Sequence, residues 1–183
     1  MGERKRQTLA VQVANEAGVL SQVSRLFSRK GYNIDSLAVG TTDDPKVSRI
    51  TIEVLADEQQ VNLVCNQLRK LLPVYSVKLL EPSQSIRREL VLIKARAATS
   101  EIRNEVIQIA NIFRGSIIDV CSETITLSLI GTEEKTEAVE TLLKGFGIVE
   151  LVRTGMIALE RGQYTIDENT KEKGEFNYGK HVL

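Results

Sequence analysis

The chain has 183 residues, of which 42% are hydrophobic and 26% are charged, the proportions of a globular chain with a packed core. This length accommodates one ordinary domain or two small ones. Lysine and arginine total 24, aspartate and glutamate total 24, and aromatic residues make up only 4%, so a basic or stacking surface for nucleic acid is disfavoured.

Side chains that bind metals or act as histidine bases are scarce. The single histidine is His181, and Cys65 and Cys121 have neither C-x-x-C spacing nor a nearby histidine, so we expect no metal site and two reduced core thiols. No apolar run approaches the roughly 20 residues that cross a bilayer, and no apolar signal segment follows the charged N-terminus. We therefore expect a cytoplasmic protein, or one of the plastid stroma if it is plastid-encoded, with neither a membrane nor a nucleic acid as partner.

The first half of the chain alternates between strand and helix patterns. Strands are predicted where apolar residues recur at every second position, and helices where they fall on one helical face between start and stop signals. The string T-D-D-P marks a turn between two of the strands. The predicted elements are a strand over residues 8–14, a helix from Val19 to Gly31, strands over 33–39 and 47–55, a helix from the capping box Asp57/Gln60 to Pro73, and a strand over 75–80.

The second half repeats this order after a polar break at E-P-S-Q-S. The predicted elements are a strand over residues 89–95, a helix from Thr99 to Gly115, paired strands over 117–121 and 125–130, a helix that Thr132 caps, and a strand over 148–152 that residues 156–159 extend. From Tyr164 onward the sequence is charged and lacks periodicity, so a mobile tail is expected.

Both halves therefore read as βαββαβ, which predicts an α+β protein of two tandem ferredoxin-like units. In each unit the helices are expected on one face of an antiparallel sheet, and the other face is left bare. A bare face or an open edge strand is commonly covered by a second copy, so oligomerisation is expected. The predicted division is a first domain over residues 7–82, a linker over 83–86, a second domain over 87–162, and a tail over 163–183.

The turn after the first strand has the composition of a site for an amino acid. Gly18 lets a ligand approach the backbone closely, and free N–H groups at the helix start can receive a carboxylate. Neutral amides such as Asn15 and Asn33 both donate and accept, which suits a zwitterion. An aliphatic side chain could be held by Val19, Leu20 and Ile34.

A plainer interpretation uses the same residues. Asn15 is compatible with a helix cap or an Asx-turn, Gly18 with relief of crowding, and Asn33 with an ordinary turn after the first helix. The residues alone leave both interpretations open.

Longer strings add a family resemblance. N-E-x-G-x-L-S-x-V-x-x-L-F followed by G-Y-N-I-x-S-L resembles the ACT domain of the small, regulatory subunit of acetohydroxyacid synthase, also called acetolactate synthase. The similarity continues through T-D-D-P and S-R-I-T-I, and in the second half through R-E-L-V-L-I-K, I-F-R-G-S-I-I-D-V and R-T-G-M-I-A-L-E-R-G. Together these strings cover about residues 7–162. Ala14 and Ala17 depart from the residues common in relatives, which could tune affinity.

The resemblance implies a noncatalytic protein that forms a homodimer through its ACT domains, binds and activates the catalytic (large) subunit, and confers feedback inhibition by valine. No cofactor is expected on this chain, whereas thiamine diphosphate, Mg and FAD are expected on the catalytic subunit. The implied effector site lies between two ACT domains, with Ser21 beside it as a supporting residue. Its implied contacts are Asn15, Gly18, Val19 and Leu20 of one chain and Asn33 and Ile34 of its mate.

The second half lacks the N-E-x-G-x-L turn, so we assign it to stability and to contact with the catalytic subunit. Three alternatives remain. The carboxylates Glu16, Asp35, Asp43 and Asp44 could form a site in a stand-alone enzyme, although no nucleophile–base pair accompanies them. A βαββαβ unit could bind RNA, although the aromatic RNA-binding strings are missing. The serious runner-up is an ACT-type amino-acid sensor that regulates a different enzyme.

Overall fold

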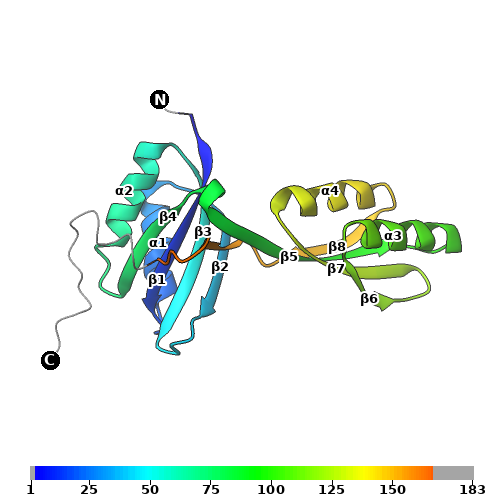
Figure 1. Cartoon of the computed structure of the whole chain (residues 1–183), viewed down its shortest axis with the longest axis horizontal. Coiled ribbons are helices and arrows are strands. Elements are labelled where there is room, and N and C mark those ends of the chain that lie inside the picture. Colours follow the sequence, from blue (N-terminus) through cyan, green and yellow to red (C-terminus); the bar gives the residue numbers. More distant parts are fainter. Residues whose placement is uncertain (1–2, 167–183) are drawn as a thin grey trace. The chain divides into compact units, whose positions relative to one another are not determined.

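A computed structural model describes residues 3–166 and divides the chain into two compact units. The first unit contains the chain up to Ile86 and resumes at Met156, and the second unit is Arg87–Gly155. In the first unit, two helices cover one face of an antiparallel sheet with strand order β2-β3-β1-β4 (Figure 1). Its elements are β1 (Lys5–Ala14), α1 (Val19–Lys30), β2 (Ile34–Thr41), β3 (Val47–Ala56), α2 (Glu58–Leu68) and β4 (Val74–Leu80).

The first unit folds as its local patterns predict. Alternate residues of β1, Leu9, Val11 and Val13, are buried against the helices. The predicted capping box of α2 is present, because the Asp57 carboxylate accepts from the Gln60 N–H at 2.8 Å and the Gln60 side chain accepts from the Asp57 N–H at 3.1 Å. The order of the elements along the chain confirms the predicted βαββαβ unit.

The second unit has the same strand order, β6-β7-β5-β8, again antiparallel and again with two helices packed on one face (Figure 1). The predicted linker, residues 83–86, ends where the two units divide, and it consists of a short 3-10 turn and the start of β5. The elements are η1 (Pro82–Gln84), β5 (Ser85–Arg96), α3 (Ser100–Ile112), β6 (Ser116–Val120), β7 (Thr124–Gly131), α4 (Glu133–Lys144) and β8 (Ile148–Arg153).

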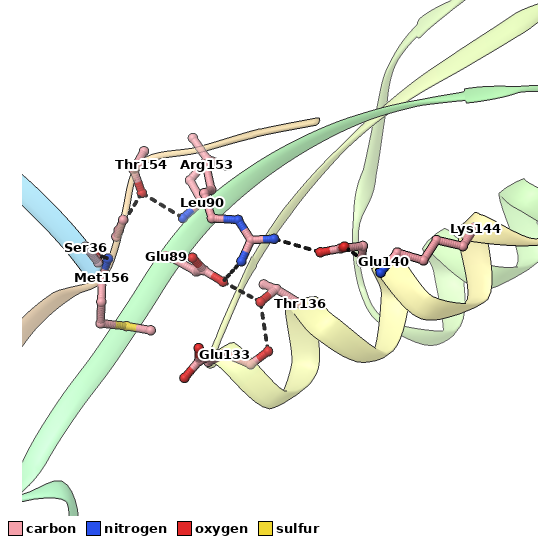
Figure 2. A network of polar contacts seen from close by, with 11 residues as sticks. Ser36, Glu89, Leu90, Glu133, Thr136, Glu140, Lys144, Arg153, Thr154 and Met156 are labelled. Carbon is pink, nitrogen blue, oxygen red and sulfur yellow. Dashed lines mark hydrogen bonds and ion pairs between the residues drawn. The ribbon is translucent and has the colours of Figure 1, made fainter. Parts of the chain in front are cut away.

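A polar network fastens α4 to the second sheet (Figure 2). The Glu89 carboxylate on β5, 5% exposed, accepts a hydrogen bond from the Thr136 hydroxyl on α4 and faces Arg153 Nη1 at 3.8 Å. Arg153 Nη2 also pairs with Glu140 at 2.7 Å, and Glu140 pairs with Lys144 at 2.9 Å. A buried carboxylate is tolerated here because it has both a hydroxyl donor and a cation.

Residues 156–166 group with the first unit in the structure, whereas the predicted second domain runs to residue 162. They were expected to extend the strand 148–152 and to belong to the second domain up to residue 162. Instead β8 ends at Arg153, and the chain returns to the first unit from Met156 onward as β9 (Ile157–Glu160), which pairs with β5. We call residues 156–166 the C-terminal strap. Of the predicted mobile tail, 163–183, residues 163–166 belong to the strap and 167–183, including His181, lie outside the described residues.

The strap covers the helix-free face of the first sheet, which was expected to be bare (Figure 1). Ala158 and Ile166 of the strap form a small buried cluster with Ala10 of β1 and Leu80 of β4. In the second sheet, Ile130 and Val152 oppose Leu90 and Leu92 on the helix-free side and remain 62% and 55% exposed.

The two thiols differ. Cys65 is buried in the core of the first unit, as predicted, whereas the prediction for Cys121 is wrong, because it follows β6 in an exposed turn.

Candidate functional site

The turn between β1 and α1 is the first component of the candidate site. Asn15, Glu16, Ala17 and Gly18 are all exposed. Gly18 has φ +86 and ψ −9, the left-handed conformation that glycine adopts without steric cost. A Cβ atom at this position would meet nothing within 4 Å, so the positive φ, and not relief of crowding, requires glycine here.

The start of α1 is open in a way that the starts of α2 and α3 are not. Asp57 and Thr99 cap α2 and α3 with side-chain hydrogen bonds, whereas Gly18 offers α1 no side-chain cap, and the predicted cap of α4, Thr132, makes no such bond either. First-turn N–H groups lack intrahelical acceptors and favour an anion such as a carboxylate. The α1 start can therefore receive the carboxylate of a ligand.

Asn15 is held beside this helix start by the neighbouring turn. Its Nδ2 donates to the Pro45 carbonyl at 2.9 Å, and its backbone N–H donates to the Lys46 carbonyl at 2.7 Å. Its carboxamide oxygen makes no hydrogen bond within residues 3–166, so the oxygen can accept from an ammonium group. The role of Pro45 was not predicted: T-D-D-P signals a turn, but nothing in the string indicates which side chain the turn will hold.

The apolar residues of α1 divide between the core and the surface. The Val19 side chain is only 4% exposed and packs in the core, and its backbone N–H donates to the Glu16 carbonyl at 3.4 Å, so in this conformation Val19 offers a ligand neither group. Leu20 is 42% exposed and Ser21 is exposed. Of the residues predicted on this helix, Leu20 is the one with an accessible apolar side chain.

Asn33 and Ile34 lie at the other end of the sheet. Ile34 pairs with Val54 on β3, whereas Ala14, next to Asn15, pairs with Val47. The seven-residue separation along β3 corresponds to about 23 Å at about 3.3 Å per residue. A single chain therefore does not bring Asn33 and Ile34 next to the β1–α1 turn.

The start of β2 is exposed at the edge of the sheet. Asn33 is exposed and its Nδ2 donates to Asp35 Oδ1 at 3.0 Å, while Ile34 is half-buried against the core. β2 is the outermost strand of its sheet. An edge strand presents unpaired backbone groups, so a second chain can approach here.

Two of the four carboxylates considered for a stand-alone enzyme accept hydrogen bonds from nearby residues. Asp35 accepts from Asn33, and Asp44 accepts from the Lys46 N–H at 2.9 Å. Within residues 3–166, no three His, Cys, Asp or Glu side chains are grouped to hold a metal ion. None of the helices in that range has the length and apolarity to cross a membrane.

Each of the two units is similar in sequence to a known protein family. The family described as "AHAS small subunit-like ACT domain" matches residues 9–76, and the family described as "Small subunit of acetolactate synthase" matches residues 88–162. The acetolactate synthase small subunit of Aquifex aeolicus is 41% identical over 171 residues, covering 93% of this chain and 88% of its own length. That of Haemophilus influenzae is 43% identical over 162 residues, covering 88% of this chain and 99% of its own.

A solved structure agrees with these relatives. The crystal structure of the acetolactate synthase small subunit from Thermotoga maritima superposes with a TM-score of 0.81 at 34% identity, covering 87% of this chain and 99% of that one. Both units and their order are therefore shared with proteins of this kind. The chain belongs to the family of acetolactate synthase small subunits.

Proposed function

We propose that the chain is the noncatalytic regulatory subunit of a cytoplasmic acetolactate synthase. It activates the catalytic subunit and confers feedback inhibition by valine, which binds between two ACT domains of a homodimer. The condensation of pyruvate with pyruvate or 2-oxobutanoate, with its thiamine diphosphate, Mg and FAD, belongs to the catalytic subunit. Family membership supports the partner, and the geometry of the first unit supports the effector site.

The observation that carries the site is the separation of its two halves. The β1–α1 turn and the start of β2 lie about 23 Å apart along the sheet, at about 3.3 Å per residue, and both are exposed. Because β2 is an edge strand, the β2 of a second chain can approach the turn of the first. Two copies would then form two equivalent sites, each with the turn of one chain and Asn33 and Ile34 of its mate.

The chemistry of these groups fits a neutral amino acid. The start of α1 suits the carboxylate, the Asn15 oxygen suits the ammonium group, and Leu20 and Ile34 suit a branched side chain. Inhibition then follows from linkage, because valine shifts the complex toward the less active state only by the difference in its affinity for the two states. A coupling of about 1–3 kcal/mol corresponds to roughly a 5- to 150-fold change.

The second unit is assigned to contact with the catalytic subunit and to stability. Its β5–α3 loop has neither glycine nor an open helix start, since Thr99 caps α3. It also leaves Ile130 and Val152 exposed on a sheet face. Contiguous exposed apolar residues on a sheet are typical of a surface for another protein.

The test is reconstitution. The full chain is mixed with the purified catalytic subunit, and acetolactate formation is measured with and without valine, while calorimetry measures valine binding to the chain alone. We expect higher activity with the chain than without it, and inhibition by valine only when the chain is present. A catalytic subunit that neither binds the chain nor gains activity from it would contradict the proposal.

A further inference from the structure

The C-terminal strap is attached to the first sheet by side chains from successive strands. Ser36 on β2 accepts a hydrogen bond through its Oγ from the Met156 N–H at 2.9 Å. Arg49 on β3 donates from Nη2 to the Ala158 carbonyl at 2.8 Å. The strap is thus fixed directly to the edge strand that begins at Ile34, immediately after Asn33.

A buried ion pair adds a third attachment, on β4. The Lys78 ammonium group pairs with the Glu160 carboxylate of the strap and donates to the Thr165 carbonyl at 2.9 Å. The Lys78 and Glu160 side chains are only 10% and 13% exposed. A lysine this buried needs a counter-charge, so the face beneath the strap is built to receive the Glu160 carboxylate.

The strap is held by these polar contacts and by a few buried apolar side chains, among them Met156, which is 4% exposed. Its apolar cluster consists of Ala158 and Ile166 against Ala10 and Leu80, two of which are alanines. A segment held by hydrogen bonds, one ion pair and only a few buried apolar side chains can shift without exposing a large apolar core. The strap can therefore respond to small changes in β2.

The strap also follows directly on the last strand of the second unit. Thr154 is bound within that unit, because its N–H donates to the Leu90 carbonyl at 3.0 Å and its Oγ1 accepts from the Leu90 N–H at 3.2 Å (Figure 2). Only Gly155, with φ +78, separates Thr154 from Met156, which is bound to Ser36. The residue that is bound to β2, Met156, is therefore only two positions along the chain from Thr154, which is bound within the second unit. A displacement of β2 can reach the second unit through this short stretch of backbone.

We infer that the C-terminal strap couples the effector site to the second unit, through the Ser36–Met156 hydrogen bond and the Lys78–Glu160 ion pair. Valine at the start of β2 changes the position of Ser36, and the strap passes this change to Thr154 and the second unit. The inference rests on the proposed function, because it describes how a valine site in the first unit regulates a partner bound through the second. Ser36 and Glu160 are positioning residues and do not contact the effector.

The test separates effector binding from inhibition. Glu160→Gln removes the counter-charge of Lys78, Ser36→Ala removes the acceptor of Met156, and Glu105→Gln removes an exposed carboxylate from α3 as a charge-matched control. Each full-length variant is assayed for valine affinity by calorimetry and for valine inhibition after reconstitution with the catalytic subunit. We expect Glu160→Gln and Ser36→Ala to keep their affinity within about twofold and to lower the maximal inhibition by about fivefold or more, at the lower end of typical allosteric coupling. Glu105→Gln should behave like the wild type.

A second measurement does not depend on the variants folding. Amide hydrogen exchange of the wild-type chain, with and without saturating valine, is expected to show a change of about fivefold or more at the Met156 N–H and in the rest of the strap. If valine binds and inhibits while strap exchange and both variants stay at wild-type values, the coupling inference is overturned and the proposed function stands. If valine does not bind the wild-type chain, the proposed function fails and the inference fails with it.

Discussion

The two units have the same strand order, yet the helix-free faces of their sheets differ in chemistry. In the first sheet this face carries Arg49 and Lys78, and the C-terminal strap covers it with matching acceptors. In the second sheet the corresponding face carries the exposed apolar residues Ile130 and Val152. The same strand order is thus found with a sheet face covered by the C-terminal strap in the first unit and with an exposed apolar sheet face in the second.

The first helix of each unit also begins differently, and here it is the first unit that is open. Thr99 satisfies the start of α3, whereas α1 begins at a left-handed glycine with no side-chain cap. The first unit is therefore covered on its helix-free sheet face and open at the β1–α1 turn, whereas the second unit is capped at the corresponding β5–α3 turn and exposed on its helix-free sheet face. This contrast indicates that the first unit suits a small ligand and the second unit suits a protein partner.

Gly18→Asp should have the largest effect. The new carboxylate would face the carboxylate of valine at the helix start and would strain a backbone with φ +86. Like charges in contact cost several kcal/mol, so valine affinity should fall by more than about 100-fold while activation of the catalytic subunit persists. Calorimetry and reconstituted assays measure the two effects.

Two controls isolate the cause in that experiment. Gly18→Asn has nearly the same size and tolerates a positive φ but adds no charge, so it should retain more affinity than Gly18→Asp. Ala98→Asp places the same carboxylate in the loop before α3 of the second unit and should leave valine inhibition unchanged. Equal loss from Ala98→Asp would remove the distinction between the two turns.

Ile130→Lys tests the open face of the second sheet. If this face contacts the catalytic subunit, the replacement exchanges a buried apolar side chain for a charge and should weaken activation by about 1.5–3 kcal/mol. Valine affinity of the chain alone should not change. Leu72→Lys, at a 97% exposed position of the first unit, is the matched control. Normal activation by Ile130→Lys would show that the contact lies elsewhere.

Asn33→Ala tests the half of the site that a mate would supply. Removing the carboxamide leaves ligand groups unpaired and should weaken valine binding by about 1–3 kcal/mol. Asn104→Ala, on the exposed side of α3, serves as the control. Calorimetry that finds the same affinity for Asn33→Ala as for the wild type would count against a direct contact.

Glu140→Gln should have the smallest effect, on the stability of the second unit. The hydrogen bond from Lys144 is the main reason that the pKa of Glu140 lies below its ordinary value of 4.5. A lowered carboxyl pKa stabilises the folded chain above pH 4.5, and this contribution is lost as the pH falls through the folded-state pKa. The variant should lose about 0.2–1 kcal/mol of unfolding free energy at neutral pH.

Denaturant titrations at several pH values measure that contribution. The difference from the wild type should shrink as the pH falls below 4.5. Glu137→Gln, exposed on the same helix, is the control. A difference between Glu140→Gln and the wild type that persists at low pH would point to packing and not to the ion pairs with Lys144 and Arg153.

Much of the fold was predictable because local signals set it. The capping box at Asp57 and Gln60, the Thr99 cap and the glycine at Gly31 mark helix ends through contacts within a few residues. Apolar alternation likewise predicts which residues of β1 face the core. The candidate site residues were predicted as a set, but the burial of the Val19 side chain and the bond from Asn15 to Pro45 were not.

The C-terminal strap shows the limit of local reasoning. Residues 156–159 were correctly expected to be extended, but a period of two indicates a strand without naming its partner, and the adjacent strand 148–152 was the nearest choice. The partners of Met156, Ala158 and Glu160 are Ser36, Arg49 and Lys78, each more than 80 positions earlier in the chain.

Local patterns were enough to predict most helices and strands, their order in both units and the family of the chain, because these depend on residues close together or on strings shared with relatives. Which sheet faces are covered and which helix starts are open is seen in the packed structure alone. It placed Asn33 at the far end of the sheet from Asn15, and it sealed the first sheet with the strap. Sheet register and long-range ion pairs fix these features, since both are set by which distant segments come together when the whole chain packs.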